Sequence, residues 1–313
     1  MISMRAVWLR EFGGPDVLVA GEAPDPVPGP GQVLVGVTFA NTTFVETQFR
    51  AGLPGPFRAE PPVIPGNGVG GVVLSGPDDL VGAPVVTSLN GSGGYAERVV
   101  VDAAAPFRVP DGLALDDAVA LLADGRTATA LIRAAGVSAG ERVLVEAAAG
   151  GVGSLLVQLA RSGGATVIAA AGGSRKTAVA RDLGADVVVD YTQPDWAAQV
   201  GPVDVVFDGV GGAIGAAAFG LVRRGGRHFS YGLASGAWTE VSEEEAAARG
   251  VVLHRGPLGS PADLRAATEW ILAEAAAGRV KALVGQRFLL ARAADAHRAI
   301  ESRATIGKTL LEV

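Results

Sequence analysis

The sequence predicts an α/β protein in which a mostly antiparallel β domain is followed by a doubly wound parallel sheet. Two observations support this class. From Met4 to about Val109 the chain is rich in proline, glycine and short β-type runs, whereas strand-like and helical patterns alternate after Ala135. Where the alternation begins, a glycine turn joins an apolar run to an amphipathic segment. The length of 313 residues suits about two domains with separate cores.

Four candidate strands lie in the first part of the chain. They are short apolar runs between turn residues: Gln32 to Phe39, Val69 to Leu74, Ala83 to Ser88 and Tyr95 to Val101. A helical pattern then runs from Leu113 to Ala135, and Asp116 and Asp117 near its start suit a helix N-terminus. We therefore expect an antiparallel sheet that leads into a long helix.

The second part repeats strand and helix patterns. Its candidate strands are Val143 to Glu146, Thr166 to Ala170, Asp186 to Val189, Asp204 to Phe207, Arg227 to Tyr231 and Val251 to His254. Such βα repeats favour a parallel, doubly wound sheet. Two helices, Pro261 to Ala277 and Ala291 to Arg303, and a strand-like run, Lys308 to Val313, are expected to return to the first domain. An active site is then expected in the cleft between the domains.

The segment Arg142 to Arg161, RVLVEAAAGGVGSLLVQLAR, is predicted to hold a pyrophosphate. An apolar strand precedes Gly150, Gly151 and Gly153, and an amphipathic helix follows them, so the helix directs its unpaired N–H groups at the glycine turn. Against the pattern G-x-G-x-x-G, Ala148 replaces the first glycine. An ordinary helix N-terminus is the alternative, but the flanking strand and helix favour a dinucleotide site.

The end of the second strand of this part indicates which dinucleotide binds. An enzyme that prefers NAD usually has an acid there, whereas this chain has Gly172, Gly173, Ser174, Arg175 and Lys176, with no acid before the following helix. The two cations, the serine and the glycine backbone suit a 2′-phosphate and predict NADPH. The alternative is that the serine caps the helix and the cations are solvated.

Composition excludes several other classes. The net charge is −6 and no run of Lys or Arg occurs, so neither a nucleic acid nor a membrane surface is an expected partner. The chain has no cysteine, which excludes disulfides and thiolate zinc sites. Its first residues, MISMRAVWLREFGG, resemble neither a signal peptide nor a membrane anchor, so a cytoplasmic protein is the default expectation.

An ordered set of segments resembles one known family. The segments MRAVWLREFGGPDVL, PPVIPGNGVGGVV, GGYAERV, ALLADGRTA, VLVEAAAGGVGSLLVQLAR, LGADVVVDY, FDGVGG and SRATIGKTLLEV are similar to the quinone oxidoreductase (zeta-crystallin-like) branch of the medium-chain dehydrogenase/reductase superfamily. The resemblance covers essentially the whole chain. It implies a GroES-like catalytic domain at 1–121 and 259–313, a Rossmann domain at 122–258, NADPH as hydride donor, no metal and a homodimer.

The resemblance also implies site residues. Those expected to bind the cofactor are Ala149, Gly150, Gly151, Val152, Gly153, Ser174, Arg175, Lys176, Tyr191, Val210 and Gly232. Thr127 matches a threonine beside the nicotinamide. Asn41, Thr43 and Thr127 are candidate donors to the oxygen of a reduced acceptor, and Arg126 is a candidate cation for a carboxylate or an enolate-like oxygen. For Arg126 a surface ion pair with Asp124 or a neighbouring acid is an equally open alternative.

Departures from zinc-dependent relatives argue against a metal site. Gly66-Asn67-Gly68 stands where those relatives carry a GHE motif, and the histidines, His228, His254 and His297, are scattered over separate elements, where a strand-face or helix-surface position is more usual. Glu46 and Gln48 are expected on the surface or at the end of a helix. Tyr95 is expected to be a packing residue whose hydroxyl is tied to the backbone.

The sequence therefore predicts an NADPH-dependent oxidoreductase that transfers a hydride to a quinone or to an α,β-unsaturated carbonyl without a metal. Two alternatives remain open at this point. One is an enoyl-thioester reductase, and the other is an NADPH-binding protein without significant turnover.

Overall fold

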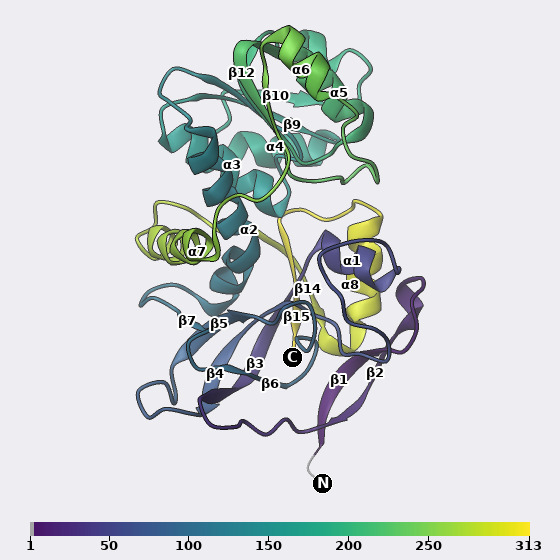
Figure 1. The fold of residues 1–313 in the computed structure, drawn as a ribbon, viewed down its shortest axis with the longest axis vertical. Helices are drawn as coiled ribbons and strands as arrows, with labels where there is room; N and C mark the ends of the chain where they lie inside the picture. Colours follow the sequence, from purple (N-terminus) through teal and green to yellow (C-terminus); the bar gives the residue numbers. More distant parts are fainter. Residues whose placement is uncertain (1–2) are drawn as a thin grey trace. The chain divides into compact units, whose positions relative to one another are not determined.

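The computed structural model describes residues 3–313, which divide into two compact units (Figure 1). The first unit comprises the described residues through Ala123 together with Leu272–Val313, and the second comprises Asp124–Ile271. The two boundaries between the units fall within helices α2 (Leu115–Ala135) and α7 (Pro261–Ala276). Among the described residues, no helix combines the length and apolar character needed to cross a bilayer.

The first unit is built on a seven-stranded sheet with the order β14-β15-β3-β4-β5-β7, in which β6 also pairs with β3. Its strands are β3 (Gln32–Thr42), β4 (Gly68–Ser75), β5 (Pro84–Ser88), β6 (Arg98–Asp102), β7 (Phe107–Arg108), β14 (Val284–Leu289) and β15 (Lys308–Glu312). Only the pairing of β14 with β15 is parallel. The pattern is therefore mostly antiparallel, as expected.

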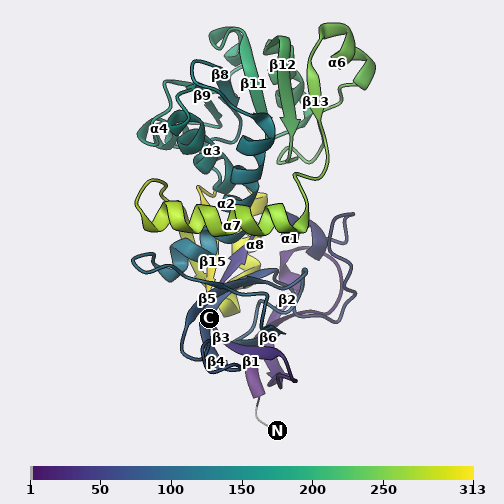
Figure 2. The same cartoon turned by 60° about the vertical axis from the view of Figure 1, so that its left-hand side comes forward.

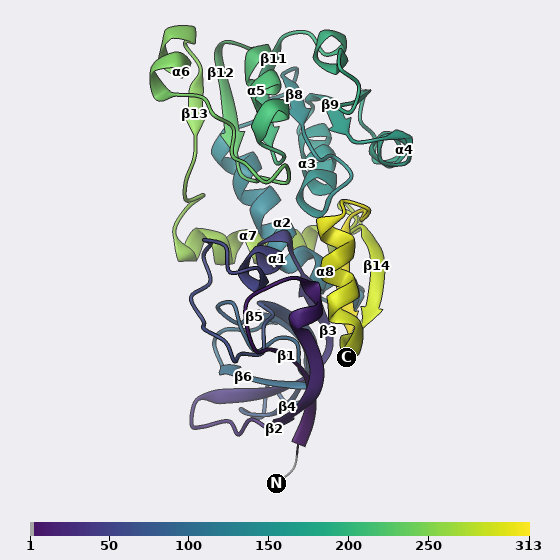
Figure 3. The same cartoon turned by 90° about the vertical axis from the view of Figure 1, so that its right-hand side faces the viewer.

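A hairpin, two helices and two 3-10 turns also belong to this unit. A separate antiparallel hairpin is formed by β1 (Ser3–Leu9) and β2 (Leu18–Pro24). Helix α1 (Phe44–Arg50) follows β3, and α8 (Ala293–Glu301) packs against α1, β14 and β15 (Figure 3). Short 3-10 turns occur at Pro15–Val17 and Leu290–Arg292.

The core of the first unit follows from alternation along β3. Val33, Val35 and Val37 are buried while the residues between them are partly exposed, as a strand with one covered face requires. At the pairing of β3 with β4, a Cβ on Gly71 would lie 1.8 Å from the Gly36 carbonyl oxygen. Glycine is therefore required at position 71 for the two strands to approach.

The second unit is a six-stranded parallel sheet with the order β10-β9-β8-β11-β12-β13 (Figure 2). Its strands are β8 (Arg142–Val145), β9 (Thr166–Ala171), β10 (Val187–Asp190), β11 (Val203–Asp208), β12 (Val222–Ser230) and β13 (Val252–His254). Its helices are α3 (Gly151–Ser162), α4 (Ser174–Asp182), α5 (Gly212–Leu221) and α6 (Glu243–Arg249), with a 3-10 turn at Trp196–Gln199. The strand order reverses between β8 and β11, which is where doubly wound sheets bind ligands.

The predicted fold class is confirmed, and most predicted elements are present within a few residues of their expected bounds. Five helices and strands were not predicted individually, namely β1, β2, β7, β14 and α1. In β2 only two of seven side chains are buried, so its sequence shows no apolar alternation, and β14 is an edge strand whose side chains are half-buried at best. Helix α1 has only seven residues, too few for a visible helical period.

Candidate cofactor site

The glycine turn places three amides at the start of α3. Gly150 is the N-cap residue and has no side chain to cap the helix. Its own N–H donates to the Ala147 carbonyl (2.8 Å), and the first bond along the helix runs from the Ser154 N–H to the Gly150 carbonyl (3.0 Å). The N–H groups of residues 151–153 precede that bond and have no intrahelical acceptor. Together with the helix dipole they suit a phosphate.

Close packing explains two of the glycines. A Cβ on Gly153 would lie 2.2 Å from the Ala147 carbonyl oxygen, so the helix can approach the end of β8 only with glycine there. A Cβ on Gly151 would lie 1.9 Å from Oδ2 of Asp124, a residue of α2. Gly150 is less constrained, because its nearest atom would be 3.1 Å away. Gly153, the last glycine of the pattern, is therefore the glycine that backbone packing requires most strictly.

The alanine that replaces the first glycine causes no backbone strain. Ala148 lies outside the left-handed region and donates its N–H to the Ala170 carbonyl on β9 (3.1 Å). The strained residue is its neighbour Ala147, whose φ is +47°. The turn thus needs a left-handed residue one position before the pattern begins.

Replacing Ala147 by glycine is expected to raise the free energy of unfolding by about 0.5–1 kcal/mol. The left-handed conformation costs a residue with a Cβ roughly 1–2 kcal/mol, and the greater freedom of glycine in the unfolded chain offsets only about 0.4–1 kcal/mol of the gain. Urea unfolding measures the change. The control is Ala148→Gly, which should destabilise the protein, and equal losses in both variants would contradict the assignment of strain to Ala147.

The predicted 2′-phosphate end is a turn between β9 and α4. Gly173, with φ +84°, is the N-cap residue of α4, so the alternative that Ser174 caps this helix is wrong. Ser174 and Arg175 are exposed and Lys176 is half-buried, all in the first helical turn. The basic first turn of α4 therefore follows directly from the end of β9.

Two neighbours from the end of β10 shape this turn. The Asp190 carboxylate accepts the Gly173 N–H (2.9 Å), so the expectation that both glycine amides are open to a phosphate is wrong for Gly173. The backbone hydrogen bond lowers the pKa of Asp190. The Tyr191 ring packs against Gly172, where a Cβ would lie 3.0 Å from Tyr191 Cε2. Tyr191 and the first turn of α4 thus border the same short loop.

Val210 and Gly232 lie at the carboxyl ends of β11 and β12. The Val210 N–H points at two carboxyl groups, Glu146 Oε2 and Asp208 Oδ1, each at 3.2 Å. A Cβ on Gly232 would lie 2.6 Å from the Gly209 carbonyl oxygen, which explains the glycine. The structure therefore brings these two predicted positions onto the sheet edge where β8 ends.

Sequence reasoning missed the two buried acids at this edge. Glu146 directly follows β8 and Asp208 ends β11, and both are fully buried. Asp208 accepts hydrogen bonds from four protein groups, the N–H groups of residues 210 and 211 and the hydroxyls of Ser230 and Thr239. The available signal was an acid at the end of each apolar run, VLVE and VVFD.

In the first unit, Asn41 and Thr43 lie where β3 leads into α1. Asn41 is buried, its amide packs over Gly68, and its Oδ1 has no hydrogen-bond partner among residues 3–313. Thr43 caps α1: its hydroxyl donates to Glu46 Oε2 (2.9 Å) and accepts the Glu46 N–H (3.3 Å). In this arrangement the Thr43 hydroxyl hydrogen is directed at the helix rather than outward.

Glu46 occupies a helix end, as expected, but it is fully buried rather than on a surface. Its second oxygen accepts the Asn67 N–H (2.7 Å). Burial raises the pKa of Glu46, although hydrogen bonds from Asn67 and Thr43 and the charge of Lys308 oppose the shift. Gln48 is half-buried on the same helix. Glu46 therefore links α1 to Asn67, the residue just before β4.

The hydroxyl of Tyr95 contacts side chains, so the expected tie to the backbone is wrong. Tyr95 is fully buried, and its hydroxyl lies 2.9 Å from His297 Nε2 and 3.3 Å from Thr42 Oγ1. His297 is also buried rather than on the surface of α8, and burial, with a contribution from Arg50, lowers its pKa to about 3. His297 is therefore neutral at ordinary pH.

Arg126 and Thr127 lie on α2, in the part that belongs to the second unit. Arg126 and Asp124, which lies two positions before it on the same helix, are both half-buried. Burial lowers the pKa of the Arg126 guanidinium, and attraction to Asp124 opposes that shift. Arg126 is thus a partly desolvated cation that the charge of Asp124 attracts.

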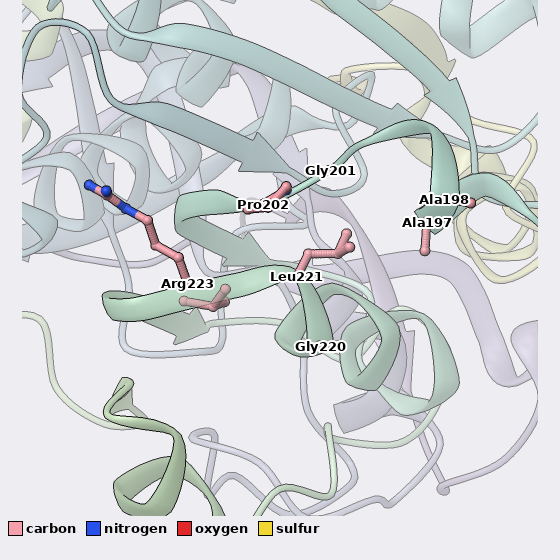
Figure 4. Close-up of a pocket in the computed structure, with 8 residues that line it drawn as sticks. Ala197, Ala198, Gly201, Pro202, Gly220, Leu221 and Arg223 are labelled. Atoms are coloured by element: carbon pink, nitrogen blue, oxygen red, sulfur yellow. The ribbon is translucent and has the colours of Figure 1, made fainter.

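Two further observations concern other possible sites. A hollow of about 380 Å³ is lined mostly by apolar atoms of Ala197, Ala198, Gly201, Pro202, Gly220, Leu221, Val222 and Arg223 (Figure 4). It lies at the amino ends of β11 and β12, opposite the edge where the glycine turn lies. Within residues 3–313 no cluster of three or more His, Asp or Glu side chains is placed to hold a metal ion.

The mostly antiparallel β unit and the doubly wound sheet, with a glycine turn at the switch point, define a medium-chain dehydrogenase/reductase. Residues 183–311 match the family described as zinc-binding dehydrogenase. The chain belongs to the quinone oxidoreductase (zeta-crystallin-like) branch of this superfamily.

Individual relatives cover nearly the whole chain. A 2-haloacrylate reductase from a Burkholderia species is 33% identical over 98% of this chain and 98% of its own length. A quinone oxidoreductase from Pseudomonas aeruginosa is 31% identical over 98% of this chain and 99% of its own. Among solved structures, Escherichia coli quinone oxidoreductase complexed with NADPH matches with a TM-score of 0.90 and 28% identity, covering 99% of this chain and all of the other.

Proposed function

We propose that the protein is an NADPH-dependent oxidoreductase that reduces a quinone or an α,β-unsaturated carbonyl compound. The observation that carries the proposal is the edge formed by the carboxyl ends of β8 and β9. It offers three amides without intrahelical acceptors at α3 and, one βα unit further on, a basic first turn at α4. The complex of the Escherichia coli relative with NADPH supports the choice of cofactor.

The residues at this edge fit NADPH in chemical terms. Amides of residues 151–153 would hold the pyrophosphate, and Ser174, Arg175 and Lys176 would hold the 2′-phosphate. When bound, NADPH supplies the hydride. The chain supplies orientation and hydrogen-bond donors, and we assign the donors near the acceptor oxygen to Asn41 and Thr127, with Thr43 available after its hydroxyl turns from Glu46.

The remaining predicted features are part of the same proposal. The β unit is proposed to bind the acceptor, the second unit to bind the cofactor, and the active protein to be a homodimer, as the resemblance implies. Light scattering in solution measures the mass, and a monomer at working concentrations would refute the dimer.

Turnover distinguishes this function from the alternatives. The loss of NADPH absorbance is followed with 1,2-naphthoquinone, 9,10-phenanthrenequinone, small enones and an enoyl thioester. Oxidation with quinones or enones supports the proposal, whereas a strong preference for the thioester would make the protein an enoyl-thioester reductase. NADPH binding without oxidation by any acceptor would leave a binding protein without turnover.

The half-buried Arg126 is expected to favour acceptors that carry a carboxylate. A haloacrylate is such an acceptor, and one relative carries that name. In Arg126→Leu we expect kcat/KM for 2-chloroacrylate to fall by about tenfold to a hundredfold, because a hydrogen bond to a charged group is worth about 1.5–3 kcal/mol. Activity with its neutral methyl ester should hardly change.

Arg126→Lys is the matched control, since it keeps the charge and should retain part of the preference for the acid. An unchanged ratio of acid to ester in both variants would show that Arg126 does not contact the acceptor.

A further inference from the structure

The two buried acids at the switch point are the strongest unassigned feature of the chain. β8 and β11 are parallel neighbours in which Val145 lies opposite Phe207. The residue that follows β8, Glu146, and the last residue of β11, Asp208, therefore stand side by side. The Glu146 N–H donates to the Phe207 carbonyl (3.0 Å), which fixes this register. Both side chains are fully buried.

The hydrogen bonds of the two acids leave one oxygen to be explained. Asp208 accepts from the Gly211 N–H (2.7 Å), Ser230 Oγ (2.8 Å) and Thr239 Oγ1 (2.5 Å), besides the Val210 N–H. Glu146 Oε2 accepts the Val210 N–H, but Glu146 Oε1 is buried and receives no hydrogen bond from the described residues. Such an atom is stable if it carries a proton and donates it to the neighbouring carboxylate.

The groups that face the pair do not supply a compensating positive charge. His228 on β12 lies 3.7 Å from Asp208 Oδ2, but burial lowers its pKa to about 4, so it is neutral near pH 7. The charge of Arg255 further disfavours the charged form of His228. The Tyr231 hydroxyl, which follows β12, interacts with both acids and with Asp124 of α2, and because burial raises its pKa it is neutral. Two neighbouring buried carboxylates cannot both be ionised in such surroundings.

We propose that Glu146 is a positioning residue: it holds a proton shared with Asp208, and this shared proton fixes the turn at Val210 and Gly211 against which the dinucleotide binds. The claim that the dinucleotide binds against this turn rests on the proposed function, since Val210 is a predicted cofactor residue. Burial raises the pKa of Glu146 well above its usual value. Burial also acts to raise the pKa of Asp208, but hydrogen bonds from Glu146 and Thr239, among others, outweigh it and lower that pKa.

The turn at Val210 and Gly211 has little freedom to adapt if the proton is lost. Gly211 is the N-cap of α5 with φ +73°, and a Cβ there would lie 2.1 Å from the Ala237 carbonyl oxygen. Both amides of the turn bond to the acid pair. Ionisation of Glu146 would place two like charges beneath them, and the turn would have to move.

The sign of the pH effect follows from the raised pKa of Glu146. Between its unfolded and its folded pKa the native chain holds one more proton than the unfolded chain, so the free energy of unfolding falls as the pH rises through this window. NADPH affinity is expected to fall with it, once the native pair begins to lose its proton. Glutamine has the shape of the protonated acid and cannot ionise, so Glu146→Gln removes both dependences.

The test measures NADPH dissociation constants by titration calorimetry from mildly acidic to alkaline pH in the full chain. The wild-type protein should lose about tenfold or more in affinity on the alkaline side. Glu146→Gln should bind as the wild type does at neutral pH and show a flat profile. Glu146→Leu, which cannot bond to the turn, should bind at least about tenfold more weakly at every pH.

The control is Glu141→Gln, which removes an acid that pairs with Arg227 at the start of the same strand. It should keep the alkaline loss seen in the wild type. The proposal is overturned if Glu146→Gln retains that loss, or if it binds tenfold more weakly at neutral pH.

Two readouts without cofactor separate this inference from the proposed function. Infrared difference spectra should show a protonated carboxyl C=O band that disappears in Glu146→Gln, and the pH dependence of unfolding should flatten in the same variant. If the wild type binds no NADPH, the proposed function and the positioning role both fail, while these two readouts still decide whether the proton is shared. Absence of the band would refute the shared proton itself.

Discussion

Gly153→Ala is expected to reduce NADPH binding by tenfold or more and to lower the free energy of unfolding by about 1–3 kcal/mol, as for an overpacked core site. The new Cβ would lie 2.2 Å from the Ala147 carbonyl oxygen. That oxygen belongs to backbone that cannot retreat easily, because Ala147 is left-handed and Ala148 is bonded to β9. The start of α3 must therefore shift, and the amides of residues 151–153 shift with it.

Gly163→Ala is a matched control at the other end of the same helix. Its Cβ would approach no atom closer than 3.4 Å, and Gly163 has a negative φ, so stability and NADPH binding should stay close to the wild-type values. Calorimetry and thermal unfolding measure both properties. If Gly153→Ala bound NADPH as tightly as this control, the glycine turn would not be the pyrophosphate site.

Lys176→Ala is expected to weaken NADPH binding by about 1–3 kcal/mol, roughly fivefold to more than a hundredfold, and to leave NADH binding nearly unchanged. The reason is that Lys176 lies in the first turn of α4, beside the loop that Tyr191 borders. The proposed function puts the 2′-phosphate there, a group that NADPH carries and NADH lacks. Titration of both nucleotides against the same preparation measures the difference.

Arg181→Ala is the control for Lys176, because it removes a cation from the last turn of the same helix, where Arg181 is exposed. It should affect the two nucleotides equally and weakly, as a screened surface charge does. Equal losses of NADPH and NADH in Lys176→Ala would remove the argument for a phosphate pocket at this turn.

The sequence predicted the fold where side-chain patterns follow from burial. Strands such as β9, with five of six residues buried, appear as apolar runs, and the glycine turn has a spacing that its geometry requires. Strand β2 could not be predicted in this way, because its exposed residues follow no period and its place is set by pairing with β1. Local pattern therefore located the βα units better than the hairpin.

The candidate site was predicted in part for a related reason. The glycine turn and the basic first turn of α4 are continuous in sequence, so a single segment reveals each. The acid pair is not continuous, since Glu146 and Asp208 are brought together only by the pairing of β8 with β11. Likewise, the contact of Tyr95 with His297 joins residues from distant segments. Isolated acids and histidines in a sequence do not reveal such partners.

The hydrogen bonds that Asp190 already accepts limit how the coenzyme preference can be redesigned. Its Oδ1 already receives the Gly173 N–H and both the N–H and the hydroxyl of Thr192, so this oxygen is occupied before any ribose arrives. On the proposed cofactor site, removing the cations of α4 would therefore weaken NADPH binding without giving the ribose of NADH a new partner. A variant that accepts NADH well needs a new carboxylate with uncommitted lone pairs, and the exposed Ser174 is the position to install it.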